Sequence, residues 1–235
     1  MRQMNLTVRY IAHSGFQVET ENNLFIFDFY QGFPQLKAKN ITIFSSHIHS
    51  DHYNPQIFEW RREYPNIQYI LSSDIRNEQS VPKESSKITF LSPYEEITMK
   101  DVRIKAYNST DEGVSFLIQA DGVRIFHAGD LNWWYWQGDS PEGIEIAEKT
   151  FKEEIAKIKG ETIDIAFFPV DPRLEEFYCF GAEYFIQEIK PKILIPMHFS
   201  EDYEAIKKFR TRMKGSSTYI IDLQHKGQIV TLTYS

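Results

Sequence analysis

The 235-residue sequence has little of what several classes of protein require. It contains a single cysteine, Cys179, and so forms no internal disulfide, which is typical of a cytoplasmic protein. No apolar run approaches the roughly 18 residues that a membrane span needs. The start, MRQMNLTVRYIAHSGF, lacks the apolar stretch and the small-residue cleavage site of a secretory signal. We therefore expect a cytoplasmic protein with no membrane partner.

Clusters of basic residues and the motifs of covalent nucleophiles are scarce as well. The formal net charge is −7, and phosphate contacts need clustered Lys and Arg, so we expect no nucleic-acid partner. The sequence has no G-x-S-x-G elbow and no glycine-rich phosphate loop, and no His or Asn pattern surrounds Cys179. Without these motifs, any catalytic chemistry must come from other side chains or from a bound metal.

The chain does carry enough apolar and aromatic residues, 42% and 15%, for a packed core. No linker, repeat or low-complexity tract divides it, which predicts one domain over residues 1–235. Alternation and β-branched content predict strands within 6–29, 41–46, 67–71, 87–126, 163–170, 193–196, 218–223 and 228–234. Capping residues and helical spacing predict helices over about 54–64, 141–160, 182–189 and 202–213.

The predicted strands come in two groups, and each group has helices interleaved in its second part. Two mixed sheets with helices outside satisfy this order, which is an α/β (α+β) arrangement. We expect the loops over 30–40, 72–87 and 131–140 to shape any pocket together, with 30–40 lying over the site.

One short stretch, FSSHIHSDHYNP over 44–55, follows directly on an apolar strand-like run. His47 and His49 are two apart, so on an extended chain they point the same way and can share a metal ion. Asp51 and His52 follow a turn, where the chain can fold back toward a second ion. Three imidazoles and a carboxylate so close together would repel or lack partners without metal.

This H-x-H-x-D-H pattern resembles the metallo-β-lactamase-fold hydrolase superfamily. The segment HAGD (127–130) resembles the strand-end Asp that bridges two metals, and PMHF (196–199) resembles the last His ligand. The opening YIAHSGFQVET, followed by LFIFDF, is similar to the first hairpin of the ascorbate-6-phosphate-lactonase-like branch. The resemblance implies a four-layer αββα sandwich, metallo-β-lactamase-like, with metals at one edge between the sheets.

The resemblance also implies two divalent ions held by a shared set of ligands. The expected ligands are His47 and His49 for the first ion, Asp51, His52 and His198 for the second, and Asp130 between them. Imidazole and carboxylate without thiolate suit Zn(II), our first choice, or Mn(II) or Fe(II). A hydroxide shared by the ions would attack the substrate, since metal binding lowers the pKa of water toward about 7. Asp51 would orient this nucleophile or take its proton.

The third metal motif departs from the superfamily, which usually has a His after the strand corresponding to VRIKAY. This chain has residues 108–113, NSTDEG, with no His. Asp111 is the favoured replacement ligand, because a carboxylate is a competent ligand and tilts a site toward harder ions such as Mn(II). Asn108 is the weaker candidate. The alternative is a first site that is weak or empty in a mononuclear enzyme.

Four other residues near these motifs have two interpretations each. His13 either reaches the cluster from the first hairpin, as a catalytic residue, or stabilises a turn. Asp28 is expected to hydrogen-bond a ligand His or a loop amide, because such carboxylates orient imidazoles. His127 is expected to be a satisfied buried histidine, and His225 a surface residue.

The aromatic stretch over 131–136, LNWWYW, follows the expected bridging Asp. Its tryptophans either line a substrate pocket or pack between a loop and the next helix or against a second copy. Arg173 either binds an anionic substrate group or forms a structural salt bridge with Asp171, Glu175 or Glu176. Tyr178 is a candidate for lining the pocket.

We therefore expect a metal-dependent hydrolase of a small ester, lactone, amide or phosphoester. The expected partner is a small-molecule substrate, and the sequence leaves open whether the chain forms a homo-oligomer. The alternative is a metal-binding or ligand-sensing protein of the same fold that has lost hydrolysis. A di-iron redox protein ranks last, because it would need a flavin partner domain that this chain lacks.

Overall fold

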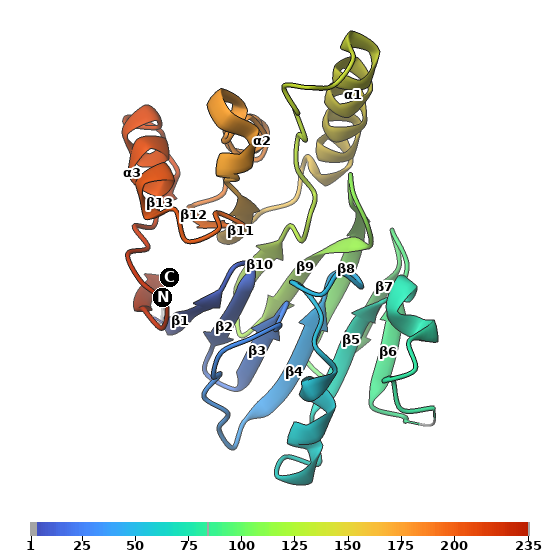
Figure 1. Ribbon diagram of the computed structural model, residues 1–235. Helices are drawn as coiled ribbons and strands as arrows, with labels where there is room; N and C mark the ends of the chain where they lie inside the picture. The colour runs from blue at the N-terminus through green and yellow to red at the C-terminus, as the bar shows by residue number, and fades with distance from the viewer. Residues whose placement is uncertain (1–3, 84, 235) are drawn as a thin grey trace.

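Alternating apolar residues build two seven-stranded sheets that pack face to face in the computed structural model, which describes residues 4–83 and 85–234 (Figure 1). The first sheet contains, in spatial order, β14 (Ile229–Tyr234), β1 (Met4–Ala12), β2 (Gly15–Glu19), β3 (Asn23–Phe27), β4 (Asn40–Ser45), β5 (Gln68–Ser72) and β6 (Ile88–Leu91). The second contains β13 (Tyr219–Ile220), β12 (Ile193–Met197), β11 (Ile165–Pro169), β10 (Val123–His127), β9 (Val114–Ala120), β8 (Val102–Asn108) and β7 (Glu96–Met99).

Helices cover the outer faces of both sheets, which gives the expected four layers (Figure 1). The second sheet carries α1 (Pro141–Ile158), α2 (Phe180–Ile189) and α3 (Tyr203–Arg212). Three short 3₁₀ helices are η1 (Pro55–Arg62), η2 (Ser73–Asn77) and η3 (Pro172–Phe177). The helix expected over 54–64 is thus a 3₁₀ helix, and Asn54 caps it by accepting from the Gln56 amide at 2.9 Å. None of the described helices is long and apolar enough to cross a membrane.

Each sheet has an antiparallel half and a parallel half. Strands β3 to β6 run parallel in the first sheet, and β10 to β13 run parallel in the second. The carboxyl ends of parallel strands meet at one edge of a sheet, where ligands commonly bind. Asp28 follows β3, and the H-x-H-x-D-H stretch follows β4. In the second sheet, Asp130, Asp171 and His198 come just after β10, β11 and β12.

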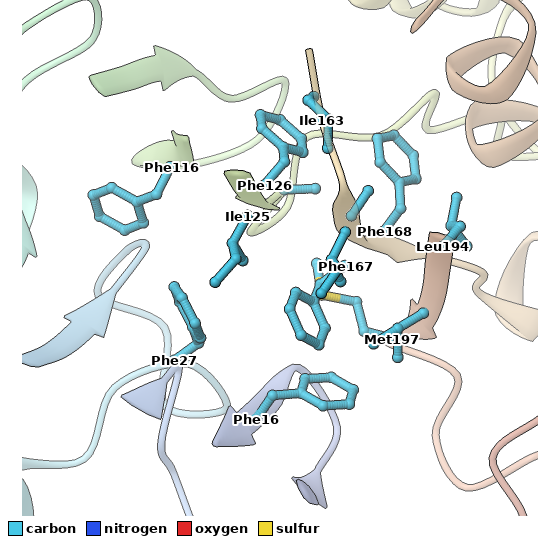
Figure 2. Packing of buried hydrophobic residues seen from close by; sticks show 14 of the residues in the cluster. Phe16, Phe27, Phe116, Ile125, Phe126, Ile163, Phe167, Phe168, Leu194 and Met197 are labelled. Carbon is cyan, nitrogen blue, oxygen red and sulfur yellow. The ribbon is translucent and has the colours of Figure 1, made fainter. Parts of the chain in front are cut away.

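The main core lies between the sheets and is rich in phenylalanine (Figure 2). Phe16 of the first sheet and Phe167 of the second have ring centroids 4.6 Å apart, and Phe44 and Phe116 are 5.3 Å apart across the same interface. Such pairs contribute about 0.5–1.5 kcal/mol each beyond the burial of their area. This packing fixes the two strand-end edges against each other.

Two expectations from the sequence were wrong in detail. The strand expected over 218–223 is reduced to the two residues of β13. The loop over 30–40 reaches the site only at its start, where the ring centroids of Tyr30 and His13 are 6.1 Å apart. The rest follows the outer side of the first sheet, where Gln35 and Gln17 exchange hydrogen bonds of 2.7 and 3.2 Å. The Gln17 side chain thus hydrogen-bonds the backbone of this loop as a neighbouring strand would.

Candidate metal centre

The H-x-H-x-D-H stretch leaves β4 and turns sharply. The amides of His52 and Tyr53 both donate to the carbonyl oxygen of His49 at 2.9 Å, which closes the turn. This turn brings His52 back beside His47, whose ring centroid is 4.1 Å away.

The carboxylate of Asp130 lies in the middle of the histidines. Its Oδ1 is 3.2 Å from Nε2 of His52 and 3.4 Å from Nε2 of His198. Its Oδ2 is 3.5 Å from Nε2 of His47. One oxygen therefore faces the second expected ion, and the other faces the first.

The ligand atoms form three overlapping groups in which all atoms lie within 4.8 Å of one another. The groups are His49 with Asp111 and Asp130, His47 with His52 and Asp130, and His13 with Asp51, His52 and His198. The structure thus brings together every residue that the sequence predicts as a metal ligand. It adds His13, whose Nε2 is 3.4 Å from the Asp51 carboxylate and whose ring centroid is 4.0 Å from that of His198.

Several polar atoms at the centre of this cluster make no hydrogen bond. Among the described residues, Nε2 of His13, His47 and His52 and Oδ1 of Asp130 are buried and make no hydrogen bond. A buried polar atom without a partner costs several kcal/mol at most sites. All four are the lone-pair atoms that a divalent cation would use, so the residues fit a metal centre.

Buried carboxylates hold the far sides of the ligand rings. Asp28 contacts Nδ1 of His52 at 2.8 Å and accepts from the Ser46 amide and hydroxyl at 2.7 Å each. Asp171 contacts Nδ1 of His198 at 3.0 Å. The prediction that Asp28 hydrogen-bonds a ligand His or a loop amide is confirmed, and Asp28 does both. Such contacts fix the tautomer and orientation of metal-binding imidazoles.

The electrostatics of the cluster leave its carboxylate ionised. Burial alone would raise the pKa of Asp130, but the neighbouring His52 and His198 outweigh it and hold this pKa far below its usual value. Burial lowers the pKa of His47 to about 4, so its lone pair is free at neutral pH. Burial also opposes the protonation of His198, yet Asp130 and Asp171 raise its pKa to about 10. A bound cation would therefore displace a proton from His198.

Three residues of the site have left-handed backbone. His13, Asp28 and His198 have φ angles of 55°, 42° and 59°. This conformation is uncommon outside glycine and costs about 1–3 kcal/mol where the surroundings impose it. The amide of His13 donates to the buried Tyr10 hydroxyl at 3.0 Å, which is one of the contacts that hold it. The chain bends here so that side chains from both sheets converge.

The third-motif loop, residues 108–113, packs directly against the start of the H-x-H-x-D-H stretch. A Cβ atom at Gly113 would lie 2.0 Å from the Ser46 carbonyl oxygen, so only glycine fits there, and its φ of 74° also favours glycine. The adjacent Val114 amide donates to that same oxygen at 2.9 Å. This close approach puts Oδ2 of Asp111 3.9 Å from Nδ1 of His49, beside the position expected for the first ion.

Sequence reasoning missed several residues that support the site. Asp171 was considered only as a partner of Arg173, although its place at the end of the strand FFPV was a usable signal. Asp74 accepts from the Ile48 amide at 2.9 Å, and Glu154 of α1 accepts from the Asn108 amide at 3.0 Å. No local pattern marked either contact, because each joins distant segments.

A cavity of about 700 Å³ opens beside the cluster. It is lined by the third-motif loop, Trp134, Trp136, Arg173 and the first turns of α1, together with ligand residues. The loop over 30–40, the described part of 72–87 and Tyr178 do not line it. The aromatic stretch thus divides: two tryptophans face the cavity, and Trp133 packs against Phe151 of α1 with ring centroids 6.1 Å apart.

The remaining candidate site residues either stabilise the core or lie at the surface. Nε2 of the buried His127 contacts the Ser14 carbonyl oxygen at 2.9 Å, as expected for a satisfied core histidine. His225 is exposed. Cys179 is buried, and burial raises the pKa of its thiol to about 12, so it is no nucleophile near neutral pH.

Two sheets with outer helices and a His/Asp cluster at their shared edge define a metallo-β-lactamase-like protein. Residues 7–134, more than half of the chain, match the model of the family described as Beta-lactamase superfamily domain. The chain belongs to this family.

Relatives of similar length support this placement. A UPF0173 metal-dependent hydrolase of Thermococcus kodakarensis is 26% identical in an alignment that covers 92% of this chain and 96% of the relative. Among solved structures, a metallo hydrolase of Ignicoccus hospitalis has a TM-score of 0.69 at 15% identity, covering 98% and 100% of the two chains. A putative metal-dependent hydrolase of Parabacteroides distasonis has a TM-score of 0.67 at 20% identity, covering 95% and 94%.

Proposed function

We propose that this protein is a cytoplasmic, single-domain metal-dependent hydrolase with two divalent ions and a small ester, lactone, amide or phosphoester substrate. The observation that carries the proposal is the set of unpartnered, buried Nε2 and Oδ1 atoms beside a cavity of about 700 Å³. A cavity of this size suits a small molecule. The match to a metal-dependent hydrolase of Thermococcus kodakarensis along nearly the whole chain supports it.

The side chains have distinct tasks in this proposal. His47, His49 and Asp111 hold the first ion, His52, Asp51 and His198 hold the second, and Asp130 serves both. When bound, two such ions supply an activated water near neutral pH and polarise the bond to be cleaved. Zn(II) is our first choice, and the two carboxylates at the first position tilt that position toward Mn(II) or Fe(II).

Asp51 is the proposed proton acceptor and orienting group. Its side chain is 47% exposed and lines the cavity, and its carboxylate is 3.4 Å from Nε2 of His13. This histidine contact holds the pKa of Asp51 well below its usual value, which keeps it anionic at neutral pH. His13 thus acts on the reaction through Asp51 and as a neighbour of the second ion.

The alternative function is a metal-binding or ligand-sensing protein that has lost hydrolysis. One observation favours it: Asp111, which stands where the superfamily usually has a histidine, is 47% exposed and 3.9 Å from His49. A loosely held first ion would leave a binding site without efficient catalysis.

The test is elemental analysis of protein purified without added metal, with assays on generic ester, lactone and phosphodiester substrates after Zn or Mn loading. We expect close to two ions per chain and turnover that Asp51→Ala abolishes. One ion or none, without turnover of any substrate class, would support the alternative. Light scattering on the same sample reports whether the chain forms a homo-oligomer, and we infer neither a nucleic-acid nor a membrane partner.

A further inference from the structure

Arg173 is the one arginine or lysine among the described residues that line the cavity. Its Nε contacts both carboxylate oxygens of Asp171, at 3.0 and 2.9 Å, and its Nη2 contacts Oδ2 at 2.5 Å. Within the described part of the chain, Nη1 makes no hydrogen bond or ion pair, and the side chain is 53% exposed. The guanidinium is therefore held on one side and has donors left on the other.

The two cavity-facing tryptophans connect Arg173 to the metal centre. The rings of Trp134 and Trp136 are parallel within 4°, with centroids 6.0 Å apart. Cζ of Arg173 lies 5.6 Å from the ring of Trp136, and the ring of Trp134 lies 5.6 Å from that of His198. These four side chains form one continuous wall, and a flat group of a ligand can lie against its indole part.

We propose that Arg173 recognises an anionic group on the substrate, a carboxylate or a phosphate, and that the indoles of Trp134 and Trp136 contact the adjoining part of the substrate. This inference rests on the proposed hydrolase function and narrows its substrates to small anionic esters, lactones or amides. An arginine suits this task because its planar fork binds carboxylate or phosphate oxygens in pairs.

The geometry also limits the distance between the anionic group of the substrate and the bond to be cleaved. Nη2 of Arg173 lies 3.4 Å from Nδ1 of His198, and Nε2 of that same ring lies 3.4 Å from Asp130. A single imidazole therefore separates the guanidinium from the centre of the cluster. The anionic group and the bond to be cleaved must lie only a few bonds apart in the substrate.

The other charged groups of the cavity do not cancel this preference. Asp51, Asp111 and Asp130 belong to the metal-ligand groups, so bound cations would offset their charge. Asp139 is an exposed lining residue outside those groups. Removing its charge should improve the binding of an anion, which makes Asp139→Asn a control of opposite sign to Arg173→Met.

The test compares esters that share one leaving group. The neutral ester is para-nitrophenyl acetate, and the anionic ones are mono-para-nitrophenyl succinate and para-nitrophenyl phosphonoacetate, which distinguish a carboxylate from a phosphate-like group. In the metal-loaded protein, Arg173→Met should raise KM for an anionic ester about 10- to 100-fold, as expected for a lost charged hydrogen bond. The neutral ester and kcat should change little, and Arg173→Lys should recover part of the loss.

Three results would overturn the inference. One is equal KM values for neutral and anionic esters in the wild type. The second is an equal loss on all three esters in Arg173→Met with a fall in metal content, which would mean that Arg173 only braces Asp171. The third is an Asp139→Asn variant that weakens the anionic esters as much as Arg173→Met does.

A binding measurement separates this inference from the hydrolase proposal. Trp134 and Trp136 report on ligands by intrinsic fluorescence, so the metal-loaded protein is titrated with benzoate, benzenephosphonate and neutral benzamide. Tighter binding of either anion that Arg173→Met weakens, in a protein that cleaves no ester, would keep the anion site and reject the hydrolase. Turnover of the neutral ester, with binding of neither anion affected by the variant, would reject the anion site and keep the hydrolase.

Discussion

Oδ2 of Asp28 lies 2.8 Å from Nδ1 of His52, and both side chains are fully buried. Burial alone would raise the pKa of Asp28, but His127 and His52 outweigh it, so this pKa is lowered and the carboxylate stays ionised. An ionised partner at Nδ1 keeps a proton on that nitrogen and leaves Nε2, which faces Asp130, as the nitrogen that can bind a cation. The position of Asp28 in the first sheet thus determines which atom of His52 is offered to a metal ion.

We expect Asp28→Asn to lower the affinity for the second ion about 10- to 100-fold, as for other carboxylates that orient metal-binding imidazoles. Asparagine keeps the shape of the side chain and tolerates the left-handed backbone at this position, where φ is 42°. The measurement is a competition titration with a chromophoric chelator. Unchanged affinity in a folded variant would mean that Ser46 and the turn orient His52 without this carboxylate.

The role of Asp111 predicts the loss of one ion and not of both. Asp111→Ala should bind close to one ion per chain by elemental analysis, because only His47, His49 and Asp130, which also serves the second ion, would remain at the first position. Glu112→Ala is the matched control, since it removes the exposed neighbouring carboxylate and should keep both ions. Asp111→Ala with full metal content would remove Asp111 from the ligand set.

Glu154 is expected to hold the third-motif loop in place. Its side chain is 3% exposed, Oε1 accepts from the Asn108 amide at 3.0 Å, and Oε2 accepts from the Tyr94 hydroxyl at 2.8 Å. Glu154→Gln replaces one acceptor by a donor, so it should destabilise the fold by about 1–3 kcal/mol. It should also weaken the first ion more than the second.

A two-step metal titration with a urea unfolding curve checks both effects of Glu154→Gln. Glu153→Gln is the control, because Glu153 is the exposed neighbour on the same helix. Equal weakening of both ions would indicate a general loss of stability and not a displaced loop.

Much of the site was predictable because its ligands follow strands directly. Spacing in H-x-H-x-D-H and the place of Asp130 and His198 after apolar runs are local patterns, and parallel strands then bring their ends to one edge. The same local logic identified Asp28 as an orienting carboxylate. Resemblance to a known superfamily supplied the ligand roles of Asp130 and His198 and the layer order of the two sheets.

The residues that sequence reasoning missed make contacts between distant segments. Glu154 and Asn108 are 46 positions apart, and Asp171 and His198 are 27 apart, so no periodicity records either pair. Most of the loop over 30–40 lies away from the expected place for a related reason. The backbone of this loop hydrogen-bonds one side chain, Gln17. That side chain points outward because of the register of β2 in the sheet.

At the edge opposite the metal centre, Asp121 joins the two sheets. Asp121 lies in the turn between β9 and β10, and its carboxylate accepts from the Thr20 hydroxyl at 2.5 Å, the Asn22 amide at 3.0 Å and the Asn23 side chain at 2.9 Å. Burial opposes ionisation here, but these donors outweigh it and lower the pKa of Asp121 below its ordinary 3.8. The stabilisation is therefore fully present above about pH 4 and is lost as the pH falls through the lowered pKa.

Asp121→Asn removes the charge and keeps a residue that tolerates the φ of 47° found at this turn. We expect the free energy of unfolding at pH 7 to fall by about 1–3 kcal/mol, because hydrogen bonds to a charged acceptor are lost. The difference between variant and wild type should shrink as the pH drops below about 4, since the wild-type carboxyl then becomes neutral too. Urea unfolding followed by tryptophan fluorescence measures both, with Asp101→Asn in the exposed β7–β8 turn as the control. A difference that stays constant down to pH 2 would mean that shape, and not the charge of Asp121, joins the sheets.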